Sequence, residues 1–156
     1  MKQIEVVTPI LIVKYDELSV DDCRLVNAAR KATANAYAPY SKFSVGAAVA
    51  LSNGEIIIGS NQENVAYPSG MCAERVACFY AHSRFPDAKF QAIAIAAQDG
   101  NGNEVKQPIS PCGSCRQALL EYEKLAEDDI KVLLVGAVEI YMLQSVKSLL
   151  PLAFAL

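Results

Sequence analysis

The stretch FQAIAIAAQ, residues 90–98, contains six consecutive apolar residues between two glutamines. A strand with one solvated face alternates apolar and polar side chains, whereas a strand covered on both faces can be apolar throughout. The stretch IKVLLVGA, residues 130–137, has the same nearly uninterrupted apolar character. We therefore predict that both stretches are strands of a sheet with helices on each of its faces.

Three helices are predicted around these strands. In residues 19–37, small and apolar side chains recur at helical spacing, with Ser19 as the N-cap and Pro39 beyond the end. Residues 71–85 predict a second helix. A third helix is expected to begin at the stretch SPCGSCRQ, residues 110–117.

A hairpin and two terminal segments complete the predicted fold. Residues 43–62 predict two strands joined at Asn53 and Gly54, a pair that tolerates positive φ at both positions. Residues 1–15 are predicted to form an arm or an early strand, and a short helical segment is expected at the C-terminus. These elements predict an α/β fold, a three-layer α/β/α sandwich with a mixed sheet, in a single domain spanning residues 1–156.

Charge and composition favour a small-molecule partner. The chain has 14 lysines and arginines, 17 aspartates and glutamates, a formal net charge of −3 and no basic run, which argues against nucleic acid binding. Its 53% apolar content suggests that copies of the chain cover part of one another's surface. The apolar run within residues 1–18 is too short to span a membrane and lacks a cleavage pattern, so we expect a cytoplasmic protein.

Two of the five cysteines, Cys112 and Cys115, lie three residues apart. Five is an odd count, and a chain of this length needs no disulfide to fold, so reduced thiols are expected. Ser110 and Pro111 are predicted to cap the third helix, which places both thiols on one face of its first turn. By itself the pair is compatible with a redox centre, with half of a structural zinc site, or with part of a catalytic metal site.

Cys72 offers a third sulfur, because it is predicted to lie at the start of another helix, where the helix dipole favours a thiolate. Cys78 and His82 lie roughly 9 and 15 Å further along that helix, so neither can bind the same ion. Cys23 is interpreted, like Cys78, as a packing residue. Three thiolates from two helix N-termini predict a zinc site with one position open for water, as in catalytic zinc sites.

Two charged residues follow Cys72 closely. Glu74 is predicted to accept and donate the protons that an activated water requires. Arg75 is predicted to donate hydrogen bonds to the thiolate sulfurs and thereby offset their negative charge. Arg116 could act in the same way, but a solvated arginine is the preferred interpretation.

Five segments resemble the small, homotetrameric, zinc-dependent cytidine deaminases of pyrimidine salvage, in the order in which that family has them. They are YSKFSVGAAV (40–49), GSNQENVAYP (59–68), MCAERVA (71–77), SPCGSCRQALLEY (110–122) and LLPLAF (149–154). The motifs CAER and PCGSC, about forty residues apart, follow the zinc-deaminase pattern with cysteine in place of the histidine ligand. The resemblance extends from about residue 20 to the end of the chain, and the first dozen or so residues have no counterpart.

The resemblance implies one zinc ion per chain, held by Cys72, Cys112 and Cys115, with Glu74 as the proton shuttle. The implied reaction is hydrolytic deamination of cytidine, and of deoxycytidine, to uridine or deoxyuridine and ammonia through a zinc-activated hydroxide. The implied biological role is pyrimidine salvage.

The resemblance also implies the substrate contacts. Asn61 and Glu63 correspond to residues that hydrogen-bond to the ribose hydroxyls, and Phe43 corresponds to a residue that lines the pyrimidine pocket. The backbones of Ala73 and Ser110 correspond to groups that hold the base carbonyl and the exocyclic amine. The implied partner is a free nucleoside, neither a nucleic acid nor a membrane.

Two aromatic residues match positions that contact other subunits in this family. Tyr67 and Phe154 correspond to residues that reach a neighbouring subunit's pocket, so the resemblance implies a homotetramer. Val65 stands where the family usually has a small residue, a departure that lies beside Tyr67.

Three alternatives remain open. A deaminase of the same fold could act on a modified cytosine nucleoside or on an aminonucleoside antibiotic. A zinc-stabilised binding module would need a fourth protein ligand and would have no use for Glu74. A thiol oxidoreductase would use the Cys112–Cys115 pair and would not need Cys72.

Overall fold

Six strands form one mixed sheet in the computed structural model, which describes residues 1–154. The strands are β1 (Leu11–Val13), β2 (Ser44–Leu51), β3 (Ile56–Ser60), β4 (Phe90–Gln98), β5 (Lys131–Val135) and β6 (Ile140–Leu143). Their spatial order is β1-β6-β5-β4-β2-β3, and the β4–β5 pair is parallel whereas the other pairs are antiparallel. The predicted mixed sheet is confirmed.

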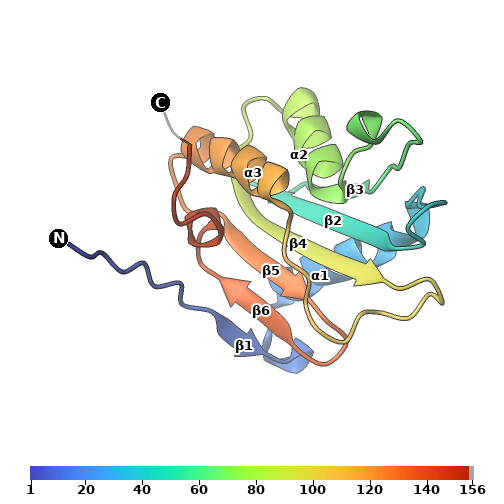
Figure 1. Ribbon diagram of the computed structural model, residues 1–156, viewed down its shortest axis with the longest axis horizontal. Helices are drawn as coiled ribbons and strands as arrows, with labels where there is room; N and C mark the ends of the chain where they lie inside the picture. The colour runs from blue at the N-terminus through green and yellow to red at the C-terminus, as the bar shows by residue number, and fades with distance from the viewer. Residues whose placement is uncertain (155–156) are drawn as a thin grey trace.

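Three α-helices cover the sheet: α1 (Val20–Ala32), α2 (Ala73–Arg84) and α3 (Gly113–Ala126). Helix α1 packs on one face, and α2 and α3 pack side by side on the other (Figure 1). The predicted three-layer α/β/α sandwich is therefore confirmed. Short 3-10 turns lie at Tyr15–Glu17, Thr33–Asn35, Tyr67–Ser69 and Val146–Leu149. Among residues 1–154, no helix is both long and apolar enough to cross a lipid bilayer.

The two faces of β4 differ in side-chain size and not in polarity. Ile93 and Ile95 point into the core beneath α2 and α3, whereas Ala92, Ala94 and Ala96 point towards α1. Successive strand residues face opposite sides of a sheet, and here both sides are covered by helices. The uninterrupted apolar run therefore reflects two cores, with the smaller side chains on the side where α1 approaches.

Close approach of α1 to β2 depends on a glycine. A Cβ atom at Gly46 would lie 2.2 Å from the carbonyl oxygen of Ala29 and 2.7 Å from the amide nitrogen of Thr33. No side chain fits between these backbones, so the absence of one at Gly46 sets how closely α1 can pack.

Gly59 plays the corresponding role between β3 and α2. A Cβ atom there would lie 2.4 Å from the amide nitrogen of Ala77 and 2.6 Å from the carbonyl oxygen of Ala73. Both are backbone atoms of the first two turns of α2, so they cannot yield without moving the helix. The position of the α2 N-terminus therefore depends on this glycine.

Replacing Gly59 by alanine is expected to lower the free energy of unfolding by about 1–3 kcal/mol, because the added methyl group overpacks this contact. Urea denaturation monitored by circular dichroism measures the change. Gly113→Ala is the matched control, because a Cβ atom at Gly113 meets nothing within 4 Å. Equal stabilities of the two variants would contradict the expected overpacking.

The start of α1 and the hairpin test two local predictions. The Ser19 side chain accepts a hydrogen bond from the amide of Asp22, which confirms the predicted N-cap. The predicted hairpin is also confirmed, and of its two turn residues Gly54 has positive φ, at 85°, whereas Asn53 does not. The amide of Gly54 donates to the carbonyl of Leu51, and this turn geometry requires one left-handed residue, not two.

The predicted N-terminal arm or strand contains β1, which pairs with β6 at one edge of the sheet. The first few residues of the chain extend away from the body of the protein (Figure 1). Strand β6 was not predicted from the sequence. It has only four residues and returns from β5 through a short turn, so it lacks the length that made β4 recognisable.

Candidate active site

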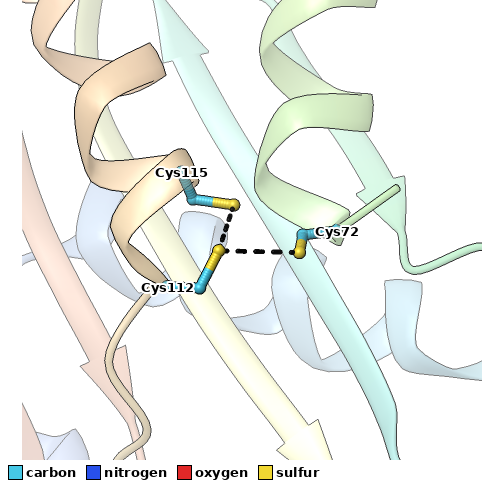
Figure 2. Close-up of side chains that lie close together, drawn as sticks. All are labelled: Cys72, Cys112 and Cys115. Carbon is cyan, nitrogen blue, oxygen red and sulfur yellow. Dashed lines mark hydrogen bonds between the residues drawn. The ribbon is translucent and has the colours of Figure 1, made fainter. Parts of the chain in front are cut away.

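Three cysteine sulfurs converge where the N-termini of α2 and α3 meet. Cys72 is the N-cap of α2, Cys112 is the N-cap of α3, and Cys115 lies in the first turn of α3. The Cys72 and Cys112 sulfurs are 3.9 Å apart, and the Cys112 and Cys115 sulfurs are 3.5 Å apart (Figure 2). All three sulfurs lie within 4.8 Å of one another, so the predicted cluster is assembled.

The start of α3 differs from the prediction. Ser110 is not the N-cap, because the helix begins two residues later with Cys112 in the capping position. The Ser110 hydroxyl instead accepts a hydrogen bond from Arg116, and Pro111 precedes the cap. Cys112 and Cys115 are nevertheless close together, because an N-cap residue and the third residue after it lie near one another at the helix start.

The donor set fits a zinc ion. A tetrahedral zinc with Zn–S bonds of about 2.3 Å holds two sulfurs about 3.8 Å apart, close to the separations seen here. Among residues 1–154, no histidine, carboxylate or further cysteine joins the three sulfurs. This set leaves one of four tetrahedral positions without a protein ligand, as in catalytic zinc sites.

The remaining cysteines and the histidine lie elsewhere, as predicted. Cys78 is buried in the core beneath α2. The Cys23 thiol donates to the carbonyl of Tyr15, and the His82 ring packs against Tyr122 with ring centroids 5.6 Å apart. All five cysteines are free thiols.

The environment of the cluster favours a thiolate. The pKa of Cys72 is lowered to about 5, mainly because the Cys115 thiol donates a hydrogen bond to its sulfur and further because the Arg75 guanidinium lies nearby. The same contact raises the pKa of Cys115, which holds the shared proton, and burial raises it further. A thiolate is the form in which cysteine binds metals.

Glu74 and Arg75 flank the cluster from the first turn of α2. The Glu74 side chain is 4% exposed, and burial raises the pKa of its carboxyl group, as does the negative charge of Cys72. One Arg75 nitrogen, Nη2, lies 3.9 Å from the Cys72 sulfur. The buried Nε of Arg75 has no hydrogen-bond partner among the described residues, so a donor remains available beside the sulfurs.

An open cavity of about 510 Å³ lies beside the cluster. Its lining residues come from the loop before β2, the segment after β3, and the start of α2: Tyr40, Ser41, Asn61, Gln62, Glu63, Asn64, Tyr67, Gly70, Met71, Cys72 and Arg75. A volume of this size is typical of small-molecule sites. The cavity thus joins one sulfur of the cluster to the predicted ribose contacts.

Asn61 and Glu63 both hold the loop that leads into β2. Asn61 Oδ1 accepts from the amide of Val45, and Asn61 Nδ2 donates to the carbonyl of Phe43. Glu63 Oε2 accepts from the amides of Tyr40 and Ser41, while hydrogen bonding from Ser41 keeps the pKa of Glu63 below its usual value. One N–H of Asn61 and the second oxygen of Glu63 have no partner in these contacts.

Four other predicted site residues lie outside the cavity lining: Phe43, Ala73, Ser110 and Phe154. Ala73 is buried in the first turn of α2, Ser110 is exposed in the turn before α3, and Phe43 is partly buried beside Asn61. Tyr67 and Phe154 are 80% and 72% exposed. The cavity of a single chain is therefore lined by only some of the residues that were predicted to contact the substrate or a neighbouring subunit.

Sequence reasoning misjudged Arg116. Its guanidinium is partly buried and donates to the carbonyls of Pro111 and Leu149 and to the Ser110 hydroxyl, so a solvated arginine was a wrong interpretation. The acceptors include a carbonyl 33 residues away in the sequence, which no local pattern could indicate.

Comparisons with known proteins agree with this geometry. A sequence model of a protein family, described as the cytidine and deoxycytidylate deaminase zinc-binding region, matches residues 19–127. A cytidine deaminase of Halalkalibacterium halodurans is 38% identical over 135 residues, which cover 86% of this chain and 95% of that protein. Solved cytidine deaminases from Mycobacterium tuberculosis and Burkholderia pseudomallei are 36% and 34% identical, with TM-scores of 0.66 and 0.69. Each covers 88% of this chain over its own full length, so the fold is shared throughout the solved chains.

Proposed function

Because the chain belongs to the cytidine and deoxycytidylate deaminase family, it is a zinc-dependent deaminase, and we propose that it hydrolyses cytidine and deoxycytidine. The products would be uridine or deoxyuridine and ammonia, and the role would be pyrimidine salvage in the cytoplasm. The observation that carries the proposal is the three-sulfur cluster beside a nucleoside-sized cavity that is lined by Asn61 and Glu63.

Cys72, Cys112 and Cys115 would hold one zinc ion per chain. When bound there, zinc supplies a Lewis acid that lowers the pKa of a water molecule towards neutrality. The N-termini of α2 and α3 both point at the cluster, and Arg75 donates towards Cys72. These positive groups would offset the charge of three thiolates, which otherwise weakens the metal as a Lewis acid.

Glu74 would move the protons. It lies two residues after Cys72, in the first turn of the same helix, and it is buried beside the cluster. In the proposed reaction its carboxylate takes a proton from water and delivers it to N3 of the cytosine ring. It then takes the proton of the hydroxyl group added at C4 and gives it to the departing amine. Burial excludes bulk water from these transfers and keeps the carboxyl group close to the reacting atoms.

The ribose and the base would occupy different parts of the site. The second oxygen of Glu63 and the remaining N–H of Asn61 offer an acceptor and a donor, which suit two neighbouring hydroxyl groups. Phe43 would line the base pocket, and the backbones of Ala73 and Ser110 would hold the base carbonyl and the exocyclic amine. The fixed loop between Tyr40 and Val45 supports this arrangement.

A homotetramer would complete the site. Tyr67 lines the cavity while remaining 80% exposed, and Phe154 is 72% exposed near the end of the described chain. Large aromatic side chains that a single chain leaves in solvent are typical of protein–protein contacts. We propose that Tyr67 and Phe154 contribute to the pocket of a neighbouring copy and that the chain forms a single domain within the tetramer.

The test combines a cytidine assay with a zinc assay on the same purified protein. We expect the wild type to contain one zinc per chain and to convert cytidine to uridine, followed by ultraviolet absorbance. Cys115→Ala is expected to lose both zinc and activity, because two thiolates remain. Cys23→Ala is the matched control, because its thiol lies outside the cluster, and it should retain both.

Two results would count against the proposal. A wild type with one zinc that leaves cytidine unchanged would exclude this substrate, and modified cytosine nucleosides would be assayed next. A wild type purified from zinc-containing medium without bound zinc would exclude the proposed metal centre.

A further inference from the structure

Arg116 connects the turn before α3 to the C-terminal part of the chain. It directly follows Cys115, and its side chain runs back past the N-terminus of α3. Nε donates to the Pro111 carbonyl at 2.8 Å, and Nη2 donates to the Ser110 hydroxyl at 2.9 Å. Nη1 donates to the Leu149 carbonyl at 2.8 Å. One guanidinium therefore binds two segments that are far apart in the sequence.

The turn that contains Leu149 is held in place by contacts other than that with Arg116. Leu149 ends the 3-10 turn Val146–Leu149, and the buried carboxylate of Glu123 on α3 accepts hydrogen bonds from the start of that turn. The Thr8 hydroxyl also donates to the carbonyl of Ser148. The position of the Val146–Leu149 turn therefore does not depend on Arg116. By binding to this turn, the guanidinium can fix the position of the segment before α3.

The segment before α3 has few means of its own to stay in place. Pro108 and Pro111 have no amide hydrogen, so they cannot donate backbone hydrogen bonds there. Cys112 follows directly, so its position depends on this turn on one side and on α3 on the other, where its carbonyl accepts a hydrogen bond from the Arg116 amide. Cys115, in contrast, is fixed within the helix itself.

We propose that Arg116 is a positioning residue, which sets the place of the Cys112 sulfur and of the Ser110 backbone by binding the turn before α3 to the Val146–Leu149 turn. Its fork of planar N–H donors suits this task, because it holds three acceptors in fixed directions, whereas lysine offers a single charged point. The inference rests on the proposed function, in which Cys112 binds zinc and Ser110 contacts the base.

The test measures zinc release from the full chain to a chromogenic chelator. We expect Arg116→Ala to release zinc about 10- to 100-fold faster than the wild type, the usual range when a residue that orients a metal ligand is lost. Arg116→Lys should give an intermediate rate. After replacement of zinc by cobalt, the thiolate-to-cobalt absorption bands of Arg116→Ala should be shifted or weakened, a change that loss of overall stability alone would not cause.

Gln117→Ala is the matched control for zinc release. Gln117 is the next residue on α3 and donates to the Phe154 carbonyl at 3.0 Å, so its loss loosens the C-terminal segment without touching the turn before α3. We expect its release rate to equal that of the wild type. Circular dichroism establishes that each variant is folded, and Arg116→Gln takes the place of Arg116→Ala if the latter does not fold.

The outcomes separate the two proposals. Arg116→Ala with wild-type zinc release and cobalt bands would overturn the positioning role, as would equally fast release from Gln117→Ala. A wild type that retains zinc but does not deaminate cytidine would overturn the proposed function alone. Faster zinc release from Arg116→Ala would in that case still support the positioning role.

Discussion

Replacement of Glu74 by glutamine is expected to lower kcat for cytidine deamination by roughly 10²- to 10⁴-fold, the usual contribution of a positioned general acid–base group. Glutamine has nearly the same shape as glutamate, so the first turn of α2 should keep its geometry. A carboxamide, however, can neither take a proton from water nor deliver one to the ring nitrogen and the leaving amine. The rate of the chemical step should therefore fall, while the affinities for substrate and zinc are retained.

The measurement follows the absorbance of cytidine under saturating conditions, with zinc content determined on the same sample. We expect one zinc per chain in both the wild type and Glu74→Gln. Glu55→Gln removes the charge of an exposed glutamate in the turn between β2 and β3, and it should retain full activity. If Glu74→Gln contained zinc and kept more than a tenth of wild-type activity, another group would have to move the protons.

The second large effect is expected in stability, at Glu123 on α3. This side chain is 2% exposed, and its two carboxylate oxygens each accept at least two hydrogen bonds. Oε2 accepts from the amides of Ile130 and Val146, and Oε1 accepts from the Ser145 hydroxyl and the Lys147 amide. Glu123 thereby holds the start of β5 and the C-terminal 3-10 turn to α3.

Glu123→Gln is expected to lower the free energy of unfolding by about 2–4 kcal/mol. Glutamine has one acceptor oxygen, so its NH₂ group takes the place of an oxygen that accepts two hydrogen bonds, and each buried donor left without a partner costs about 1–3 kcal/mol. Hydrogen bonds to a charged acceptor are lost as well. For a chain of this length the midpoint of thermal unfolding should fall by roughly 5–15 °C.

Urea denaturation and thermal melts of the purified proteins test this expectation. Glu121→Gln, on the exposed side of the same helix, removes the same charge and should change the stability by less than about 0.5 kcal/mol. If the two variants had equal stability, the Glu123 contacts would not contribute as the geometry indicates.

The fold was predictable where a single physical cause determined the pattern of apolar residues in the sequence. The run from Ala92 to Ala97 is apolar because helices cover both faces of β4, and this single fact predicted the three layers. The sequence could not show that the alanines face α1, because that depends on how closely Gly46 lets the helix approach. Strand β6 escaped prediction because four residues contain too little periodicity to distinguish a strand from a loop.

The cysteine cluster was predictable because the sequence signals of helix starts are local. Cys72 and Cys112 proved to be N-caps, and the predicted start at Ser110 was wrong by two residues without separating the sulfurs. The contacts of Arg116 and Glu123 were not predictable, because their partners lie in distant segments. The roles assigned to Glu74 and to the substrate-binding residues stay predictions until they are measured.

The separation of the three clustered thiols along the chain has a consequence for folding. Cys72 and Cys112 are 40 residues apart, and the interior strand β4 lies between them. A bound metal would therefore act as a cross-link that closes a loop around the middle of the sheet. By the loop-entropy relation used for disulfides, a closure of this length lowers the conformational entropy of the unfolded chain, which corresponds to about 4 kcal/mol of stability. Removal of the metal would thus lower the stability of the fold as well as the activity.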